Sequence, residues 1–457
     1  MASSIRTLNP TTGKIEKEFQ PHTSIEINQK IDLADNTFKT WRYESFENRK
    51  QIIKAVANEM RVQQEKLARL ITVEMGKPIR ESRIEIEYCA RIFDYYADNA
   101  ESFLQPRSYL SEKGDALIVP DPIGIILGVM PWNFPFSQIT RFAAPNLMAG
   151  NTILLKTASN IPQCAQAFED LFTTVNAPKG IYQNLFLNGK DTSALVTNSK
   201  IKGVSLTGSD TAGSSIAKVA GEHIKKSVLE LGGTDPMIVL NDADLDKVIA
   251  GTINGRLRNA GQACTSSKRI IVQENIYNKY LSKITEYLKN LKVGNPLDEN
   301  TDMGPVSSNS ALNTLLDQIN DSIEKGAKLI TGGKQIGTEG SFLAPTILTD
   351  LKPGMRAYDE EVFGPVLCFI KVKTIDEAIT IANDTAYGLG ASIYTETTPL
   401  AQEIARKIES GMVYINKQVS SSPELPFGGT KKSGYGRELS KAGILEFVNE
   451  KLILTSL

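Results

Sequence analysis

Histidine and cysteine are scarce in this 457-residue chain, and their arrangement argues against several classes of site. The two histidines, His22 and His223, have no second type of metal ligand beside them at metal-binding spacing. Neither a histidine-based metal site nor a Ser-His-Asp triad is therefore expected. The cysteines form no C-x-x-C pair, which argues against a zinc knuckle or disulfide framework and favours a reducing compartment. The four cysteines are Cys89, Cys164, Cys264 and Cys368. Any general base is expected to be a carboxylate, and no metal is expected.

The sequence also lacks a strong excess of one sign of charge and lacks long apolar runs. Lys plus Arg (51) and Asp plus Glu (52) give a formal net charge of -1, so no strong field attracts nucleic acid or an anionic membrane. Apolar runs such as IGIILGVM (123–130) are far shorter than a membrane span, and the N-terminal MASSIRTLNPTTGK lacks the apolar segment of a signal peptide. The sequence thus predicts a cytoplasmic protein that acts on a small molecule.

The pattern of apolar residues predicts two α/β domains. Residues 24–104 have apolar side chains at helical spacing. From about residue 122, short apolar runs such as TILLK and PMIVL alternate with longer amphipathic segments. That alternation is typical of βαβ units and of a parallel sheet covered by helices. A second series of strands and helices runs from about 235 to 430.

Two further segments predict a small β arm. Residues 105–122 resemble a hairpin that turns at 112–114, and the C-terminal EFVNEKLILTSL ends in another strand-like run. Because isolated strands need partners, we expect these segments to form an arm completed by another subunit, in a homodimer or homotetramer. We assign 105–122 and 431–457 to this arm.

The stretch RNAGQACTSS, residues 258–267, contains the cysteine best suited to chemistry. A free cysteine is usually a small buried apolar residue, but Cys264 lies among polar and small residues that seldom build a core. The sequence CTSSKRII suggests that Cys264 begins a helix, whose dipole would favour the thiolate. Cys264 is either a structural thiol or a nucleophile, and its neighbours favour the nucleophile.

Two other polar residues lie close to the ends of apolar runs. Glu230 in LELGGTDP precedes two glycines, so it is either a solvated strand end or a carboxylate raised into a cleft. Asn133 in VMPWNFPFSQITR is framed by Pro131 and Pro135. Such a rigid frame suits an amide that donates to an oxyanion.

Six motifs resemble, in the same order, those of the aldehyde dehydrogenase superfamily. They are PWNFP (131–135), LTGS (206–209), LELGG (229–233), GQAC (261–264), EEVFGPV (360–366) and PFGGTKKSGYGRE (426–438). The resemblance covers essentially the whole chain. It implies an α/β fold with a Rossmann-like NAD(P)-binding domain (1–104 and 123–232), an α/β catalytic domain (233–430) and a small β oligomerisation arm (105–122 and 431–457).

The resemblance implies catalytic roles for three residues. Cys264 would attack an aldehyde carbon, and the Asn133 side-chain amide and the Cys264 backbone N–H would hold the oxyanion of the thiohemiacetal. Hydride would pass to the nicotinamide, and Glu230 would activate the water that hydrolyses the thioester. Family members that transfer the acyl group to coenzyme A usually lack this glutamate, so its presence favours release of a free acid.

The resemblance also implies a site for NADP or NAD. LTGSDTAG has Gly208 and Gly213 at G-x-x-x-x-G spacing after a predicted strand, so a helix N-terminus can approach the pyrophosphate, with Ser209 as a hydroxyl donor. Lys156 would meet the adenosine ribose and Glu361 the nicotinamide ribose. The residues implied to bind the cofactor are Pro131, Trp132, Lys156, Ser159, Gly208, Ser209, Gly213, Leu231, Glu361 and Phe363.

Three positions depart from common family patterns. Ser159 stands where a glutamate often binds the ribose and would repel a 2′-phosphate, so NADP use is expected. Phe142 stands where many relatives have a lysine near the general base, which leaves Glu438 or water for the proton path. Ser266 replaces a second cysteine that forms a redox-switch disulfide in some members, so that regulation is expected to be absent.

Arg141 and Arg258 lie in the segments that carry the catalytic motifs. They are either ordinary surface arginines or cations beside the substrate, where their desolvation would be costly unless a substrate carboxylate paired with them. Together with Ser421 they match the substrate-binding positions of the succinate-semialdehyde dehydrogenase subgroup. The alternatives are another small aldehyde, an acyl-coenzyme A-forming reductase, or a catalytically silent binding protein on the same fold.

Overall fold

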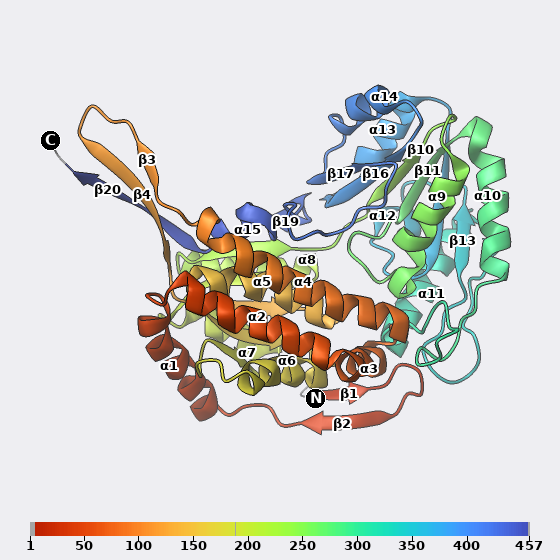
Figure 1. Ribbon diagram of the computed structural model, residues 1–457. Helices are drawn as coiled ribbons and strands as arrows, with labels where there is room; N and C mark the ends of the chain where they lie inside the picture. Colours follow the sequence, from red (N-terminus) through yellow and green to blue (C-terminus); the bar gives the residue numbers. More distant parts are fainter. Residues whose placement is uncertain (1–4, 188, 456–457) are drawn as a thin grey trace.

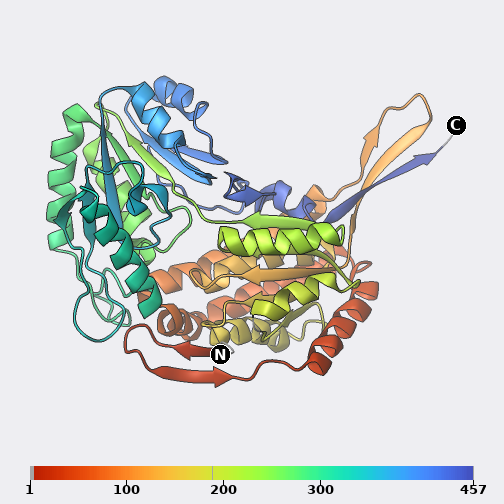
Figure 2. The same cartoon turned by 180° about the vertical axis from the view of Figure 1, so that it is seen from behind.

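The computed structural model describes residues 5–187 and 189–455, which form two α/β lobes and a projecting β arm (Figures 1 and 2). One lobe contains a six-stranded sheet and is called the first lobe; the other contains a seven-stranded sheet and is called the second lobe. Both sheets are largely parallel, so the predicted fold class is confirmed.

The first lobe is built on a sheet of order β19-β9-β8-β5-β6-β7. Its strands are β5 (Ile125–Met130), β6 (Thr152–Thr157), β7 (Tyr182–Asn184), β8 (Ile201–Thr207), β9 (Lys226–Glu230) and the antiparallel edge strand β19 (Gly434–Tyr435). Its helices are α1 (Ser24–Trp41), α2 (Phe46–Val62), α3 (Gln64–Met75), α4 (Ile79–Phe103), α5 (Pro135–Ala149), α6 (Pro162–Thr174), α7 (Gly189–Thr197) and α8 (Asp210–Glu222).

Both faces of this sheet are covered by helices. In β5, Ile126 packs into the core formed with α2 to α6, whereas its neighbours Ile125 and Leu127 pack into the core formed with α1 and α8. Successive side chains of a strand point to opposite faces, so a strand buried on both faces shows a continuous apolar run. This explains why the run IGIILGVM was recognisable in the sequence.

The order of the first sheet reverses between β5 and β8. From β5 the chain continues outward to β6 and β7, and it then returns to the other side of β5 for β8 and β9. In open α/β sheets, ligands bind outside the carboxyl ends of the strands at such a reversal. Pro131 follows β5 and Gly208 follows β8, so both lie at this position.

The second lobe is built on a sheet of order β12-β13-β14-β11-β10-β16-β17. Its strands are β10 (Pro236–Val239), β11 (Arg269–Gln273), β12 (Lys328–Thr331), β13 (Thr346–Thr349), β14 (Val366–Val372), β16 (Gly390–Tyr394) and β17 (Met412–Ile415). Its helices are α9 (Leu245–Thr252), α10 (Glu274–Lys289), α11 (Asn309–Glu324), α12 (Arg356–Asp359), α13 (Ile375–Asn383) and α14 (Thr398–Ala405). A π-helical turn, η1 (Ile253–Leu257), and a 3₁₀ turn, η2 (Arg258–Gly261), follow α9.

The projecting arm is a three-stranded sheet of order β20-β4-β3. The hairpin of β3 (Arg107–Tyr109) and β4 (Asp115–Pro122) turns at 112–114 as predicted, and β20 (Val448–Thr455) pairs along the whole of β4. The C-terminal segment that precedes β20 makes contacts with both lobes. Strand β18 (Thr430–Lys431) pairs with β15 (Tyr387–Gly388). Strand β19 pairs with β9, and α15 (Ser440–Leu445) packs on α5. The C-terminal segment therefore connects both lobes before it enters the arm.

The sequence does not predict the N-terminal hairpin of β1 (Ile5–Leu8) and β2 (Ile15–Phe19). Four of the five β2 residues are exposed, so the strand has no apolar run.

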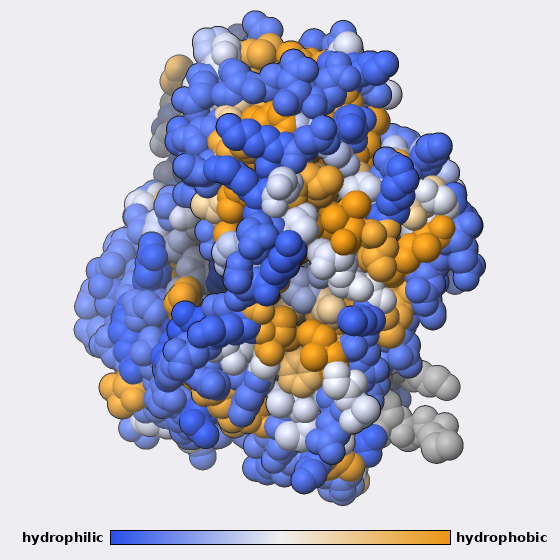
Figure 3. Space-filling model, turned by 90° about the vertical axis from the view of Figure 1, so that its right-hand side faces the viewer, coloured by the Kyte–Doolittle hydropathy of each residue, from blue (hydrophilic) through white to orange (hydrophobic). Residues whose placement is uncertain are grey.

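The outer face of the second lobe is mostly hydrophilic, and apolar side chains reach it in separate groups (Figure 3). Over 5–187 and 189–455, no helix has the length and apolarity needed to cross a membrane.

Gly128 of β5 packs against Phe142, the residue that stands in place of the family lysine. A Cβ added at Gly128 would lie 2.5 Å from Phe142 Cε1 and 3.0 Å from Leu155 Cδ1.

We expect Gly128→Ala to lower the free energy of unfolding by about 1–3 kcal/mol through overpacking. The measurement is the denaturant midpoint. Gly221→Ala in α8 is the control, because a Cβ there meets nothing within 4 Å, and it should be neutral or stabilising. A loss as large in the Gly221 variant would contradict the packing explanation.

Candidate active site

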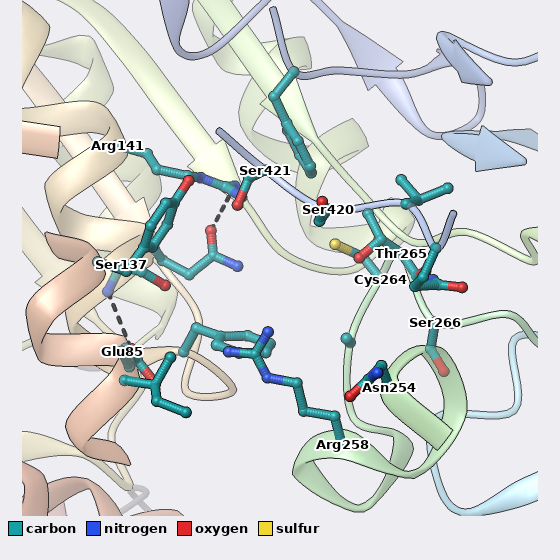
Figure 4. A pocket seen from close by; sticks show the side chains of 18 of the residues that line it. Glu85, Ser137, Arg141, Asn254, Arg258, Cys264, Thr265, Ser266, Ser420 and Ser421 are labelled. Carbon is teal, nitrogen blue, oxygen red and sulfur yellow. Dashed lines mark hydrogen bonds between the residues drawn. The ribbon is translucent and has the colours of Figure 1, made fainter. Parts of the chain in front are cut away.

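Two cavities meet at Cys264. The first, of about 330 Å³, is also lined by all three residues predicted to bind the substrate, Arg141, Arg258 and Ser421 (Figure 4). The second, of about 240 Å³, is lined by Cys264 and by Asn133. The thiol is thus accessible from two separate spaces, as a reaction between two bound molecules requires.

Gln138 of α5 also lines both cavities, and no motif in the sequence identifies it. Its Oε1 accepts a hydrogen bond of 2.7 Å from Arg141 Nη2, which is drawn in Figure 4. The signal that could have identified it is its i, i+3 spacing to Arg141 on one face of a helix.

Cys264 lies in a turn five residues before β11, so the prediction that it begins a helix is wrong. No helix dipole stabilises its thiolate. Burial instead raises the pKa of Cys264 to about 12, and the positive charges of Arg141 and Lys268 act against this rise. The neighbouring cations, rather than a helix terminus, favour ionisation of the thiol.

The segment before the thiol is strained and is bonded to the Asn133 loop. Asn259 and Ala260 have φ of 53° and 51°, in the left-handed region that residues with a Cβ seldom adopt. The Asn259 side chain donates to the Asn133 carbonyl at 2.8 Å, and Asn133 Nδ2 donates to the Gln262 carbonyl at 3.0 Å. Strain of this kind persists only where surrounding contacts hold it, and it is common at functional sites.

Two N–H groups near the thiol are available for an oxyanion. The Asn133 amide has two N–H groups and uses one for Gln262, so the other is free. The Cys264 backbone N–H has no acceptor in the described part of the chain. Both expected donors can therefore bind an oxygen next to Cys264.

Glu230 is the last residue of β9, as predicted, but it lines neither cavity. It is only 2% exposed, and among the described residues neither of its carboxyl oxygens has a hydrogen-bond partner. Gly428 packs over it, so that a Cβ at Gly428 would lie 2.7 Å from Glu230 Oε1. Burial, followed by the nearby Glu438 carboxyl, raises the pKa of Glu230 well above its usual value. The carboxyl is thus buried in this structure rather than raised into a cleft.

Arg141 is buried and already has an ion-pair partner in the protein. The expectation that a substrate carboxylate must pair with it to offset desolvation is therefore wrong. Its Nη2 lies 2.7 Å from Glu438 Oε2, and its guanidinium lies 4.3 Å from the centre of the Phe427 ring. Arg141 therefore does not need a substrate carboxylate for neutralisation. Phe142, which stands at the lysine position of the family, is buried in the core.

Arg258 is much less constrained than Arg141. Its side chain is 44% exposed, and its Nε lies 3.9 Å from Glu81 Oε2, a long ion pair. Its guanidinium also lies 5.8 Å from the centre of the Phe134 ring. In Figure 4, Arg258 lies across the first cavity from Arg141 and Ser421. Of the two arginines, Arg258 is the one with free capacity for an anion.

The second cavity lies at the strand-order reversal of the first sheet and contains most residues predicted to bind the cofactor. Ser209 caps α8 by accepting from the Ala212 N–H at 3.2 Å, and the Trp132 and Phe363 rings meet edge to face at 5.8 Å. The cofactor candidates that line this cavity are Pro131, Trp132, Gly208, Ser209, Leu231, Glu361 and Phe363. A Cβ at Gly232 would lie 2.4 Å from Glu361 Oε2, so a glycine is needed for this close approach. The lining therefore suits the nicotinamide and phosphate part of a dinucleotide, with its phosphates at the α8 N-terminus.

Three cofactor candidates lie outside this cavity. Gly213 permits α8 to pack against Leu231, because a Cβ there would lie 2.6 Å from Leu231 Cδ2. Lys156 is the penultimate residue of β6 and has no ion-pair partner among the described residues. Burial lowers the pKa of its ammonium group. Ser159 follows in the same loop. Lys156 and Ser159 remain candidates for contacts with the adenosine end.

The comparisons with known proteins agree with this geometry. The family model described as the aldehyde dehydrogenase family matches residues 1–453. The chain is 44% identical over 447 residues to the succinate-semialdehyde dehydrogenase [NADP(+)] of Deinococcus radiodurans, covering 98% of this chain and 94% of that protein. It is 42% identical to succinic semialdehyde dehydrogenase from Streptococcus pyogenes, whose crystal structure with NADP+ superposes with a TM-score of 0.97, covering 99% of this chain and 100% of that chain. This chain therefore belongs to the aldehyde dehydrogenase family and is an aldehyde dehydrogenase-type oxidoreductase.

Proposed function

We propose that this enzyme oxidises succinate semialdehyde to succinate and accepts NADP at least as well as NAD. The observation that carries the proposal is the first cavity, in which Arg141, Arg258 and Ser421 surround a single nucleophilic thiol. A carboxylate at the far end of the aldehyde would pair with Arg258, and Ser421 is a candidate hydroxyl donor on the opposite wall of the cavity. The names of the similar proteins from Deinococcus and Streptococcus support this substrate class.

The first chemical step is the attack of the Cys264 thiolate on the aldehyde carbon. The carbonyl oxygen becomes an oxyanion, which the free Asn133 N–H and the Cys264 backbone N–H stabilise. Arg141 contributes a positive charge beside the thiol and so increases the thiolate fraction. A nicotinamide cofactor, when bound in the second cavity, supplies the hydride acceptor.

The second step is hydrolysis of the thioester. Glu230 acts as the general base that removes a proton from the attacking water. Burial raises the pKa of Glu230, so its carboxylate holds a proton more strongly than usual, and Glu230 must leave its position under Gly428 to reach the water. Glu438, which is paired with Arg141, is the adjacent carboxyl that can receive the proton where the family lysine is replaced by Phe142.

The cofactor preference follows from the loop after β6. Ser159 brings no carboxylate to the ribose, and Lys156 is a cation without an ion-pair partner among the described residues. A 2′-phosphate therefore meets attraction and no repulsion at this end of the site.

We also propose that the arm joins subunits in a homodimer or homotetramer. The apolar side chains exposed on it support this assembly; they include Tyr109, Leu110, Leu452, Ile453 and Leu454. Four cysteines without disulfides support a reducing, cytoplasmic compartment.

Cys264 and Glu230 should fail at different steps. We expect Cys264→Ala to abolish both cofactor reduction and covalent acylation, whereas Glu230→Gln should form the thioester and hydrolyse it slowly. Mass spectrometry of the enzyme after one turnover measures the acyl adduct. Cys368→Ala, a change in the buried strand β14, is the control and should retain activity. A Glu230→Gln enzyme that turned over at the parental rate would require a different base.

Ser159→Glu should shift the cofactor preference toward NAD. The new carboxylate would repel a 2′-phosphate and bind a ribose hydroxyl, so the NADP/NAD ratio of kcat/KM should fall by about tenfold or more. Ser159→Ala removes the hydroxyl without adding charge and should leave the ratio nearly unchanged. If the glutamate variant kept the parental ratio, the 2′-phosphate would be recognised elsewhere.

The two arginines should behave differently with charged and neutral aldehydes. We expect Arg258→Ala to lower kcat/KM for succinate semialdehyde by roughly tenfold to hundredfold, because one desolvated arginine–carboxylate pair is lost, and to leave butanal oxidation nearly unchanged. Arg141→Ala should impair both substrates, because it leaves the buried Glu438 without its partner. Equal losses for both aldehydes in Arg258→Ala would argue against the carboxylate substrate.

A further inference from the structure

Lys268 is a buried lysine that lines neither cavity. Its ammonium group contacts three backbone carbonyls of the loop that contains Cys264. Lys268 is 1% exposed and immediately precedes β11. Its Nζ lies 2.9 Å from the Ala263 carbonyl oxygen, 2.7 Å from that of Cys264 and 3.4 Å from that of Ser266. The same Nζ lies 3.2 Å from Glu361 Oε1. A buried ammonium ion is costly unless oxygens surround it, so these four contacts hold the loop in one arrangement.

One of these contacts determines where the Cys264 N–H points. The Ala263 carbonyl and the Cys264 N–H belong to the same peptide unit, and the chain has no cis peptide bond over its described residues. In a trans peptide the C=O and the N–H point in opposite directions. Because Lys268 holds the carbonyl, the N–H is directed away from Lys268, and it has no acceptor among the described residues.

Lys268 also connects this peptide to the second cavity. Glu361 lines that cavity, and its Oε1 accepts both from Lys268 and from the Gly233 N–H at 3.0 Å. The backbone N–H of Lys268 donates to the Asp235 carbonyl at 3.0 Å. The lysine is thus attached at both ends, and its ammonium group cannot move without breaking several bonds.

We propose that Lys268 is a positioning residue of the oxyanion hole, which orients the Cys264 N–H by holding the Ala263 carbonyl and which connects that peptide to Glu361 of the cofactor cavity. The positive charge on the carbonyl side also polarises the peptide and strengthens the N–H as a donor. This inference rests on the proposed role of Cys264 as the nucleophile.

The test compares two reactions of the same thiol. Acylation by p-nitrophenyl acetate, without nicotinamide, forms an oxyanion, whereas alkylation by iodoacetamide forms none. Both rates scale with the thiolate fraction, so their ratio at one pH cancels any effect of Lys268 on the pKa of Cys264. For Lys268→Met we expect the ratio of acylation to alkylation to fall about tenfold to hundredfold, as when an oxyanion donor is lost.

Two variants make the comparison sharper. Lys268→Gln keeps an N–H donor without the charge and should give an intermediate ratio, and it replaces Lys268→Met if that protein does not fold. Lys225→Met is the matched control, because Lys225 also donates to two backbone carbonyls, those of Val196 and Asn198, but lines neither cavity. It should keep the parental ratio.

The outcomes separate this inference from the proposed function. A fall in the ratio for Lys268→Met alone supports an oxyanion role. An unchanged ratio, whether both rates fall together or neither falls, would overturn it and leave Lys268 as a structural anchor of the loop. A parent enzyme that reacts with neither reagent at Cys264 would instead contradict the nucleophilic role of the thiol.

Discussion

The Cys264 thiol is partly buried where two cavities meet, and desolvation raises its pKa to about 12, so the surroundings must supply positive charge for it to ionise. Arg141 and Lys268 supply that charge. Each is itself buried, and a buried cation is costly unless oxygens surround it. Glu438 pairs with Arg141 and Glu361 with Lys268. Each of the two cations that favour ionisation of the thiol is thus held by an ion pair.

These two ion pairs come from different parts of the fold. Arg141 belongs to α5 of the first lobe, and Lys268 precedes β11 of the second lobe. Asn133 of the first lobe and the strained Asn259 of the second are joined by a hydrogen bond of 2.8 Å. The site is complete only when both lobes are packed together, so lobe packing and the orientation of the reacting groups depend on the same contacts.

The carboxyls Glu230 and Glu438 share a single buried arginine. Burial and the proximity of Glu438 raise the pKa of Glu230, whereas Arg141 acts in the opposite direction. Two close carboxyls cannot both ionise easily, so a proton is readily retained by the pair. With Phe142 packed on Gly128 in place of the family lysine, no second cation enters this region from α5. The pair is thus a suitable place for the proton that hydrolysis releases.

The sequence by itself determined the two α/β lobes, the hairpin of the arm, and the positions of Glu230 and Asn133 close to strand ends, because apolar periodicity and motif order are local properties. It did not reveal that Cys264 lies in a turn, that Glu230 is covered by Gly428, or that Arg141 already has a partner. No sequence motif identified Lys268, which is buried with four oxygen neighbours. Only the tertiary structure decided these points, because the pairing and burial of a charge depend on residues that are distant in the chain and become neighbours when the two lobes pack together.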